Sequence, residues 1–133
     1  MEKDLKFTVR TQEITAQEID DLMATALEGG INHWCCYAEV IDKPEGECKK
    51  VIFRSDVISR NGTLKLYDTD SDDTWILTRE KFLKGVDRAL DHFFCDWTKC
   101  PIYSNVQDMV ENHDGDVADV IIQYALFDEI VFV

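Results

Sequence analysis

The segment from residue 15 to residue 41 constrains the fold most, because it predicts a helix, a sharp helix end and a strand in direct succession. Thr15 and Glu18 have the spacing of a capping box, in which each side chain bonds a backbone N–H at the helix start. Apolar residues then recur at helical spacing. Gly29 and Gly30 favour the left-handed backbone that ends a helix. This unit predicts a core-building element and contains no recognisable catalytic motif.

The period of the apolar residues changes to two from Trp34 onward, which predicts a strand directly after the helix. Strict alternation would place Trp34, Cys36 and Ala38 on one face of that strand. Cys35 and Tyr37 would then lie on the opposite face. A strand that follows a helix after so short a connection is expected to pack back against it.

The rest of the chain predicts further short strands and helices. Asn61-Gly62 is typical of a hairpin turn, because both residues tolerate positive φ. The predicted elements are strands at 5–10, 64–66, 75–77 and 130–133, an acidic hairpin turn at 68–73, and helices that begin at Thr78, at a Ser104/Gln107 capping box and near Val117. We therefore expect a single α+β domain over residues 1–133, with a mostly antiparallel sheet and three to four helices packed against it.

The net charge is the outlying property of the composition. Acidic residues number 27 against 14 basic ones, giving a formal charge of −13. Such a surface repels nucleic acid and anionic membranes and attracts basic surfaces of other proteins. We therefore expect a protein partner, with neither direct nucleic-acid binding nor membrane association.

Three further features bear on the compartment. No apolar run approaches the roughly 20 residues that a membrane helix needs. The first ten residues lack the apolar stretch of a secretory signal. Five cysteines without such a signal are typical of a reducing compartment, where thiols stay free or bind metal. These features predict a cytoplasmic protein.

Thiols and one imidazole suggest a structural zinc site. His92 and Cys95 are three residues apart on a predicted helix, so they share a face. Cys100 follows in the next loop, and Cys48 lies in another predicted turn. Zinc takes four Cys or His ligands, often two close in sequence and two from elsewhere. The alternative for each cysteine is the role of a small apolar side chain.

The last third of the chain concentrates the negative charge. From Pro101 onward there is no Lys or Arg. The candidate partner-binding carboxylates are Asp108, Glu111, Asp114, Asp116 and Asp119. Closely spaced carboxylates resemble the phosphates of a duplex and can occupy a nucleic-acid-binding groove. An apolar anchor is expected beside them, and Trp97 and Tyr103 are the candidates. The alternative is an ordinary solvated face.

Motifs of common enzyme classes are absent. The sequence contains no G-x-S-x-G, no phosphate-binding glycine loop, no H-E-x-x-H and no dinucleotide fingerprint. A Cys–His pair would need a third group to orient the histidine, and no spacing singles one out. We therefore expect a protein without catalytic activity.

Four segments resemble a family of small uncharacterised acidic proteins of phages and prophages in Firmicutes. These are LMATALEGGINHWCCYAEV, GTLKLYD, LTREKFLKGV and DVADVIIQYALFDEIVFV. The resemblance implies a compact α+β domain and supplies no catalytic residue. Small acidic proteins of this origin include inhibitors of host defence, anti-CRISPR proteins among them. By this analogy, we expect a protein that binds a CRISPR effector nuclease and blocks its nucleic-acid groove.

Two alternatives remain open at this stage. A ligand-binding module that sequesters a signalling nucleotide would need cationic side chains for the phosphates. The arginines available for this role are Arg54, Arg60, Arg79 and Arg88. The second alternative is a structural component of the phage particle.

Overall fold

The organising helix begins with the predicted capping box. The Glu18 amide donates to Thr15 Oγ1 at 3.1 Å, and the Thr15 amide donates to Glu18 Oε1 at 2.8 Å. The helix, α1, covers Ala16–Thr25, and a π-helix at Ala26–Gly30 continues it. The π-helix ends at Gly30, close to the predicted position, but neither Gly29 nor Gly30 has the left-handed backbone that the glycine pair predicts.

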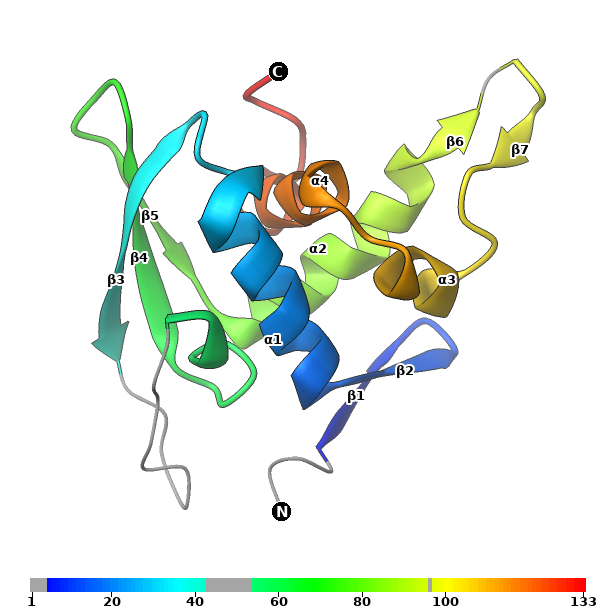
Figure 1. Cartoon of the computed structure of the whole chain (residues 1–133), viewed down its shortest axis with the longest axis horizontal. Helices are drawn as coiled ribbons and strands as arrows, with labels where there is room; N and C mark the ends of the chain where they lie inside the picture. The colour runs from blue at the N-terminus through cyan, green and yellow to red at the C-terminus, as the bar shows by residue number, and fades with distance from the viewer. Residues whose placement is uncertain (1–4, 43–53, 96) are drawn as a thin grey trace.

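The computed structural model describes residues 5–42, 54–95 and 97–133 (Figure 1). The remaining elements are β1 (Lys6–Val9), β2 (Gln12–Thr15), β3 (Cys35–Asp42), a 3₁₀ turn (Arg54–Asp56), β4 (Thr63–Asp68), β5 (Thr74–Leu77), α2 (Arg79–His92), β6 (Phe94–Cys95), β7 (Cys100–Pro101), α3 (Val106–Glu111) and α4 (Gly115–Phe127). This confirms an α+β fold in which every strand pairing is antiparallel. None of the helices described is long and apolar enough to cross a membrane.

The strands form three small sheets. β3, β4 and β5 make a three-stranded sheet in that order, and the pairs β1–β2 and β6–β7 form separate hairpins. Figure 1 shows α4 and α2 beside the three-stranded sheet, with α1 in front of them. One continuous apolar core joins these layers, and it includes Leu64 and Leu66 of the sheet with Phe82 and Ile121 of the helices. The chain therefore buries its apolar surface mainly between helices and one sheet.

Helices α2 and α4 approach each other closely at a glycine. A Cβ atom built at Gly85 would overlap the carbonyl oxygen of Ile121 and lie 3.0 Å from both the amide nitrogen and the Cβ of Ala125. Only hydrogen fits there without a shift of one helix. Phe82, Val86 and Leu90 of α2 are buried, and α4 is the principal partner of this helix.

The predicted alternation of β3 is wrong at its first residues. Trp34 and Cys35 are both buried, whereas Cys36 and Tyr37 are exposed. The register with β4 shifts between Cys35 and Tyr37, which marks an irregularity in the ladder. A bulge places consecutive residues on the same side, so Cys36 does not share a face with Ala38.

The predicted final strand at the C-terminus is also wrong. Residues 130–133 have no regular structure, and the buried Gln123 of α4 bonds their backbone. Gln123 Oε1 accepts from the amides of Val131 (2.9 Å) and Phe132 (2.8 Å), while Gln123 Nε2 donates to the Phe132 carbonyl at 2.9 Å. One side-chain amide thus supplies the hydrogen bonds that a neighbouring strand would supply.

Two local predictions also need correction. The Asn61-Gly62 pair lies at the end of the long connection between β3 and β4, directly before Thr63, so it is not the two-residue turn of a hairpin. A short apolar run at 51–53, also favourable for a strand, lies outside the described residues. The N-cap of α3 is Asn105, whose side chain accepts from the Asp108 amide, and not Ser104.

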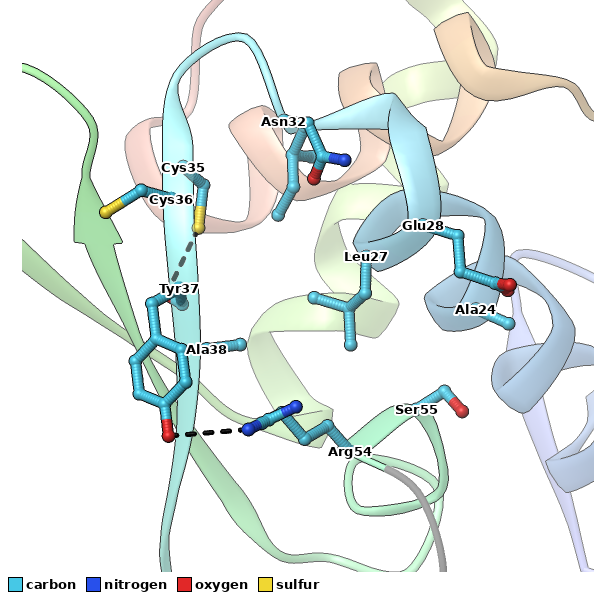
Figure 2. A pocket seen from close by; sticks show the side chains of 11 residues that line it. Ala24, Leu27, Glu28, Asn32, Cys35, Cys36, Tyr37, Ala38, Arg54 and Ser55 are labelled. Atoms are coloured by element: carbon cyan, nitrogen blue, oxygen red, sulfur yellow. Dashed lines mark hydrogen bonds between the residues drawn. The ribbon is translucent and has the colours of Figure 1, made fainter.

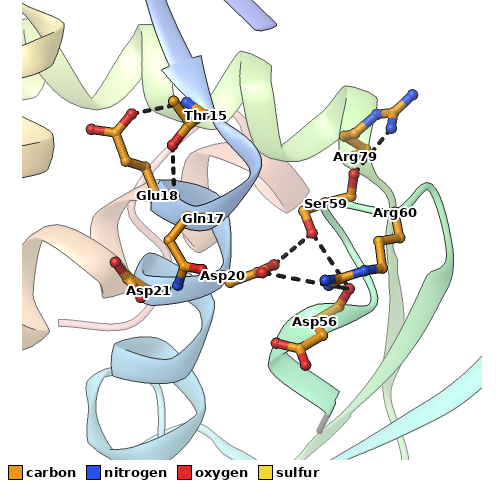
Figure 3. A network of polar contacts seen from close by, with 9 residues as sticks. All are labelled: Thr15, Gln17, Glu18, Asp20, Asp21, Asp56, Ser59, Arg60 and Arg79. Atoms are coloured by element: carbon orange, nitrogen blue, oxygen red, sulfur yellow. Dashed lines mark hydrogen bonds and ion pairs between the residues drawn. The ribbon is translucent and has the colours of Figure 1, made fainter. Parts of the chain in front are cut away.

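A buried polar network attaches the 3₁₀ turn to α1 (Figure 3). Ser59 Oγ donates to Asp20 Oδ1 at 2.5 Å, and Arg60 Nη1 lies 3.4 Å from Asp20 Oδ2. Arg79 donates to the Ser59 carbonyl at 3.1 Å. Burial raises the pKa of Asp20, and the Ser59 hydrogen bond and the Arg60 charge oppose that rise. The network connects the middle of α1 to the start of α2 through Ser59 and Arg60.

Candidate partner-binding surface

Four of the predicted carboxylates lie on α3 and at the start of α4. Asp114 is the N-cap of α4 and accepts from the Val117 amide at 3.0 Å. Asp108 accepts from the Ser104 amide at 2.9 Å, so both residues also stabilise helix starts. Glu111 and Asp116 are exposed. We refer to Asp108, Glu111, Asp114 and Asp116 as the acidic face.

No lysine or arginine compensates the acidic face within the described part of the chain. The ion pairs there join Arg10 to Asp87 and Asp91, Arg60 to Asp20, Lys84 and Arg88 to Asp128, and His33 to Asp119. None of them includes a carboxylate of the acidic face. Its carboxylates therefore have no ion-pair partner among the described residues.

Tyr103 lies beside the acidic face. Its ring packs edge-on against Phe93, with the centroids 5.5 Å apart. Burial raises the pKa of the Tyr103 hydroxyl, and the negative charges of Asp114, Asp108 and Asp116 raise it further. The structure thus brings this predicted anchor next to the carboxylates, although its ring is only partly exposed.

Asp119 differs from the other candidate carboxylates. Its side chain is 15% exposed and accepts from Trp34 Nε1 at 2.7 Å and from Gln123 Nε2 at 3.0 Å. Its second oxygen lies 3.5 Å from His33 Nε2. These contacts give Asp119 a role in fixing the core, so we do not include it in the acidic face.

A hairpin with exposed apolar side chains extends from the end of α2, at the same end of the molecule as α3 (Figure 1). We call β6, β7 and residues 97–99 between them the hairpin arm. Trp97 in its turn is 94% exposed, Phe94 is 45% exposed, and Ile102 directly after β7 is 56% exposed. Sequence reasoning singled out Trp97 but missed the arm, because strands of two residues have no detectable period.

The predicted zinc ligands are only partly brought together. Cys95 and Cys100 are cross-strand partners in the hairpin arm. His92 Nδ1 lies 3.1 Å from Tyr124 Oη on α4, so that hydroxyl occupies one ring nitrogen. Cys48 lies outside the described residues, among which no group of three or more ligand side chains is placed to hold a metal. The zinc site stays a prediction.

A cavity of about 570 Å³ lies between the end of α1, the π-helix and β3 (Figure 2). Leu27, Cys35 and Ala38 give it apolar walls, and Arg54 and Tyr37 lie at one side. The Arg54 guanidinium is 4.9 Å from the centre of the Tyr37 ring and donates to its hydroxyl at 3.4 Å. No carboxylate pairs with Arg54 among the residues described. The cavity thus offers one cation beside an apolar wall.

The four arginines considered for a nucleotide do not converge. Arg60 pairs with Asp20, and Arg88 lies 3.7 Å from Asp128. Arg79 bonds the Ser59 carbonyl and stacks on Phe7. Only Arg54 lines the cavity, whereas a diphosphate needs several charge-assisted hydrogen bonds.

No family model matches the sequence, and comparison with characterised proteins and with solved structures finds no similar chain. The resemblance to the phage family therefore rests on the four quoted segments alone.

Proposed function

We propose that the chain is a phage-encoded, non-enzymatic inhibitor that binds a basic nucleic-acid-binding surface of a host defence protein in the bacterial cytoplasm. A CRISPR effector nuclease is the first partner to test, because of the resemblance to phage proteins. The supporting observation is the uncompensated acidic face beside the exposed apolar side chains of the hairpin arm.

The two surfaces have complementary roles in this proposal. Carboxylates that face lysines and arginines steer the encounter and fix its orientation. Charge contributes less to the lifetime of a complex than an apolar group buried at the centre of the interface. Among the large apolar side chains described, only that of the last residue, Val133, is more exposed than Trp97, and burying Trp97 would supply that contribution.

The charge contribution is tested by replacing the acidic face with amides: Asp108→Asn, Glu111→Gln, Asp114→Asn and Asp116→Asn. Asparagine caps helices as well as aspartate does, so the fold should be retained. We expect association with the partner captured from a host lysate to slow by about tenfold or more at low ionic strength. Association of the unmodified chain should also slow as salt is added, because screening shortens the field to about 8 Å near 0.15 M. Stopped-flow or surface-based kinetics measures both effects.

A matched variant separates local from total charge. Asp70→Asn, Asp72→Asn, Asp73→Asn and Glu80→Gln remove the same charge from exposed positions around β5. This variant should associate nearly as fast as the unmodified chain. Equal effects of the two variants would mean that only net charge matters, and salt-independent association would rule out the mechanism.

The apolar contribution is tested by Trp97→Ala. We expect the complex to dissociate about tenfold faster or more, with little change in the association rate, because loss of a central aromatic anchor acts on dissociation. Ile76→Ala, on β5 at the other side of the molecule, is the control with an exposed apolar side chain. An unchanged dissociation rate for Trp97→Ala would exclude the hairpin arm from the interface.

The cavity beside Arg54 favours small-ligand binding as a second candidate function. Its volume falls within the range of ligand pockets, which are mostly apolar with few polar groups. Its single arginine fits a ligand with one anionic group better than a signalling nucleotide. If neutralising the acidic face leaves partner association unchanged, this cavity becomes the site to test.

A further inference from the structure

The cavity between the end of α1, the π-helix and β3 is bounded on two sides by irregular backbone (Figure 2). Leu27 and Glu28 line it from the π-helix. Cys35 and Tyr37 line it from β3, on either side of the shift in register with β4. Short π-helical segments and β-bulges are both frequent at functional sites. The backbone therefore departs from regular geometry on both sides of the same cavity.

The cavity has an apolar wall that borders the core. Ile31 and Ala38 are buried, and Leu27 is partly buried against them. Cys35 adds a neutral thiol to this wall, because burial raises its pKa. Its Sγ donates to the Tyr37 carbonyl at 3.4 Å. This wall fits a hydrocarbon chain or ring better than a polar group.

Polar groups gather at one end of the cavity, where the 3₁₀ turn supplies Arg54 and Ser55. Arg54 Nη2 donates to Tyr37 Oη at 3.4 Å. A guanidinium has five N–H groups, so others can donate to an anion, and the Tyr37 hydroxyl has a hydrogen of its own to donate. None of the ion pairs among the described residues includes Arg54. This end of the cavity therefore fits one carboxylate.

We propose that the cavity binds a medium-chain monocarboxylate, with its carboxylate at Arg54 and its hydrocarbon chain against Leu27 and Ala38. Glu28 also lines the cavity, and its charge would repel a second anionic group. The proposal deepens the second candidate function, small-ligand binding, and rests on it. None of the cavity residues belongs to the acidic face or to the hairpin arm, so the inhibitor function does not require this ligand.

Octanoate tests the proposal, with octanol as the neutral ligand of the same chain length. We expect octanoate to bind the full chain about tenfold more tightly than octanol, because a charge-assisted hydrogen bond is stronger than a neutral one. Isothermal titration calorimetry measures both affinities. The amide NMR signals of residues 27–38 should shift on binding, since these residues form most of the cavity lining.

Three variants assign the binding to this site. Arg54→Gln, at an exposed position, should remove the preference for octanoate and leave octanol binding unchanged. Arg88→Gln removes an exposed arginine from α2 and should change neither affinity. Leu27→Trp would fill the cavity and should abolish the binding of both ligands, with its fold checked by circular dichroism.

The outcomes separate this proposal from the functions it extends. If neither ligand binds, the proposal and the second candidate function both fail. Equal binding of octanoate and octanol, or an unchanged octanoate affinity in Arg54→Gln, would overturn the assignment to carboxylates while small-ligand binding stands. Octanoate binding that a folded Leu27→Trp variant retains would place the ligand elsewhere and would also overturn it. None of these measurements involves a partner protein, so they leave the inhibitor function untouched.

Discussion

Replacing Trp34 with alanine is expected to lower the free energy of unfolding by about 3–5 kcal/mol, the usual cost of removing a buried large aromatic side chain. Trp34 is 1% exposed and stacks on Phe132 with the ring centroids 5.1 Å apart. Its indole also contacts Trp75 and Phe127 edge-on and donates to Asp119. The substitution would leave a cavity and remove one of the two hydrogen bonds that Asp119 Oδ1 accepts.

Chemical denaturation monitored by circular dichroism measures this loss. Small domains have a total stability of about 5–15 kcal/mol, so the variant would lie near the limit of folding. Trp97→Ala is the matched control, because Trp97 is 94% exposed and its loss should change stability by less than about 0.5 kcal/mol. Similar losses for both tryptophans would contradict the described core.

Gly85→Ala is expected to destabilise the protein by about 2 kcal/mol, although alanine favours helices by about 1 kcal/mol over glycine. The added methyl group would meet the carbonyl oxygen of Ile121, which belongs to the backbone and cannot rotate away. Separating α2 from α4 to make room would loosen the contact between two core helices. The steric cost therefore exceeds the gain in helix propensity.

Gly29→Ala is the same chemical change, but we do not expect it to destabilise the protein. A Cβ atom at Gly29 would have no neighbour within 4 Å. Its substitution should be neutral or stabilising by up to about 1 kcal/mol, because it reduces the freedom of the unfolded chain. Measuring the unfolding midpoints of both variants under the same conditions tests the two expectations. A Gly85→Ala variant as stable as the Gly29→Ala variant would mean that the helices are not in close contact.

The sequence predicted correctly those elements that depend on residues close to one another in the chain. The capping box of Thr15 and Glu18 and the N-cap at Thr78 depend on residues three apart, and both are confirmed. The hairpin of β4 and β5 around its acidic turn is also confirmed, because its alternation and turn residues are continuous in sequence. The α+β fold class follows from such elements.

Features that depend on distant contacts escaped prediction. The β3 bulge reverses the expected faces of Cys35 and Cys36, and a pattern of period two cannot reveal it. The inward orientation of Asp119 depends on Trp34, which lies 85 residues earlier in the chain. In sequence, Asp119 is indistinguishable from the exposed carboxylates that precede it. The sequence therefore predicted four carboxylates of the acidic face, but it wrongly added Asp119 and did not reveal the hairpin arm.

The hydrogen bonds between Gln123 and the C-terminal residues should affect how fast the backbone amides there exchange hydrogen with solvent. An amide in an edge strand exchanges its hydrogen with solvent when the strand frays. The Val131 and Phe132 amides instead bond a side chain anchored in α4, and Phe132 also stacks on Trp34. Release of these two amides would leave the buried Gln123 Oε1 without a hydrogen-bond donor and would remove Phe132 from Trp34. The tail and the central helix thus belong to one cooperative unit, although no sheet joins them.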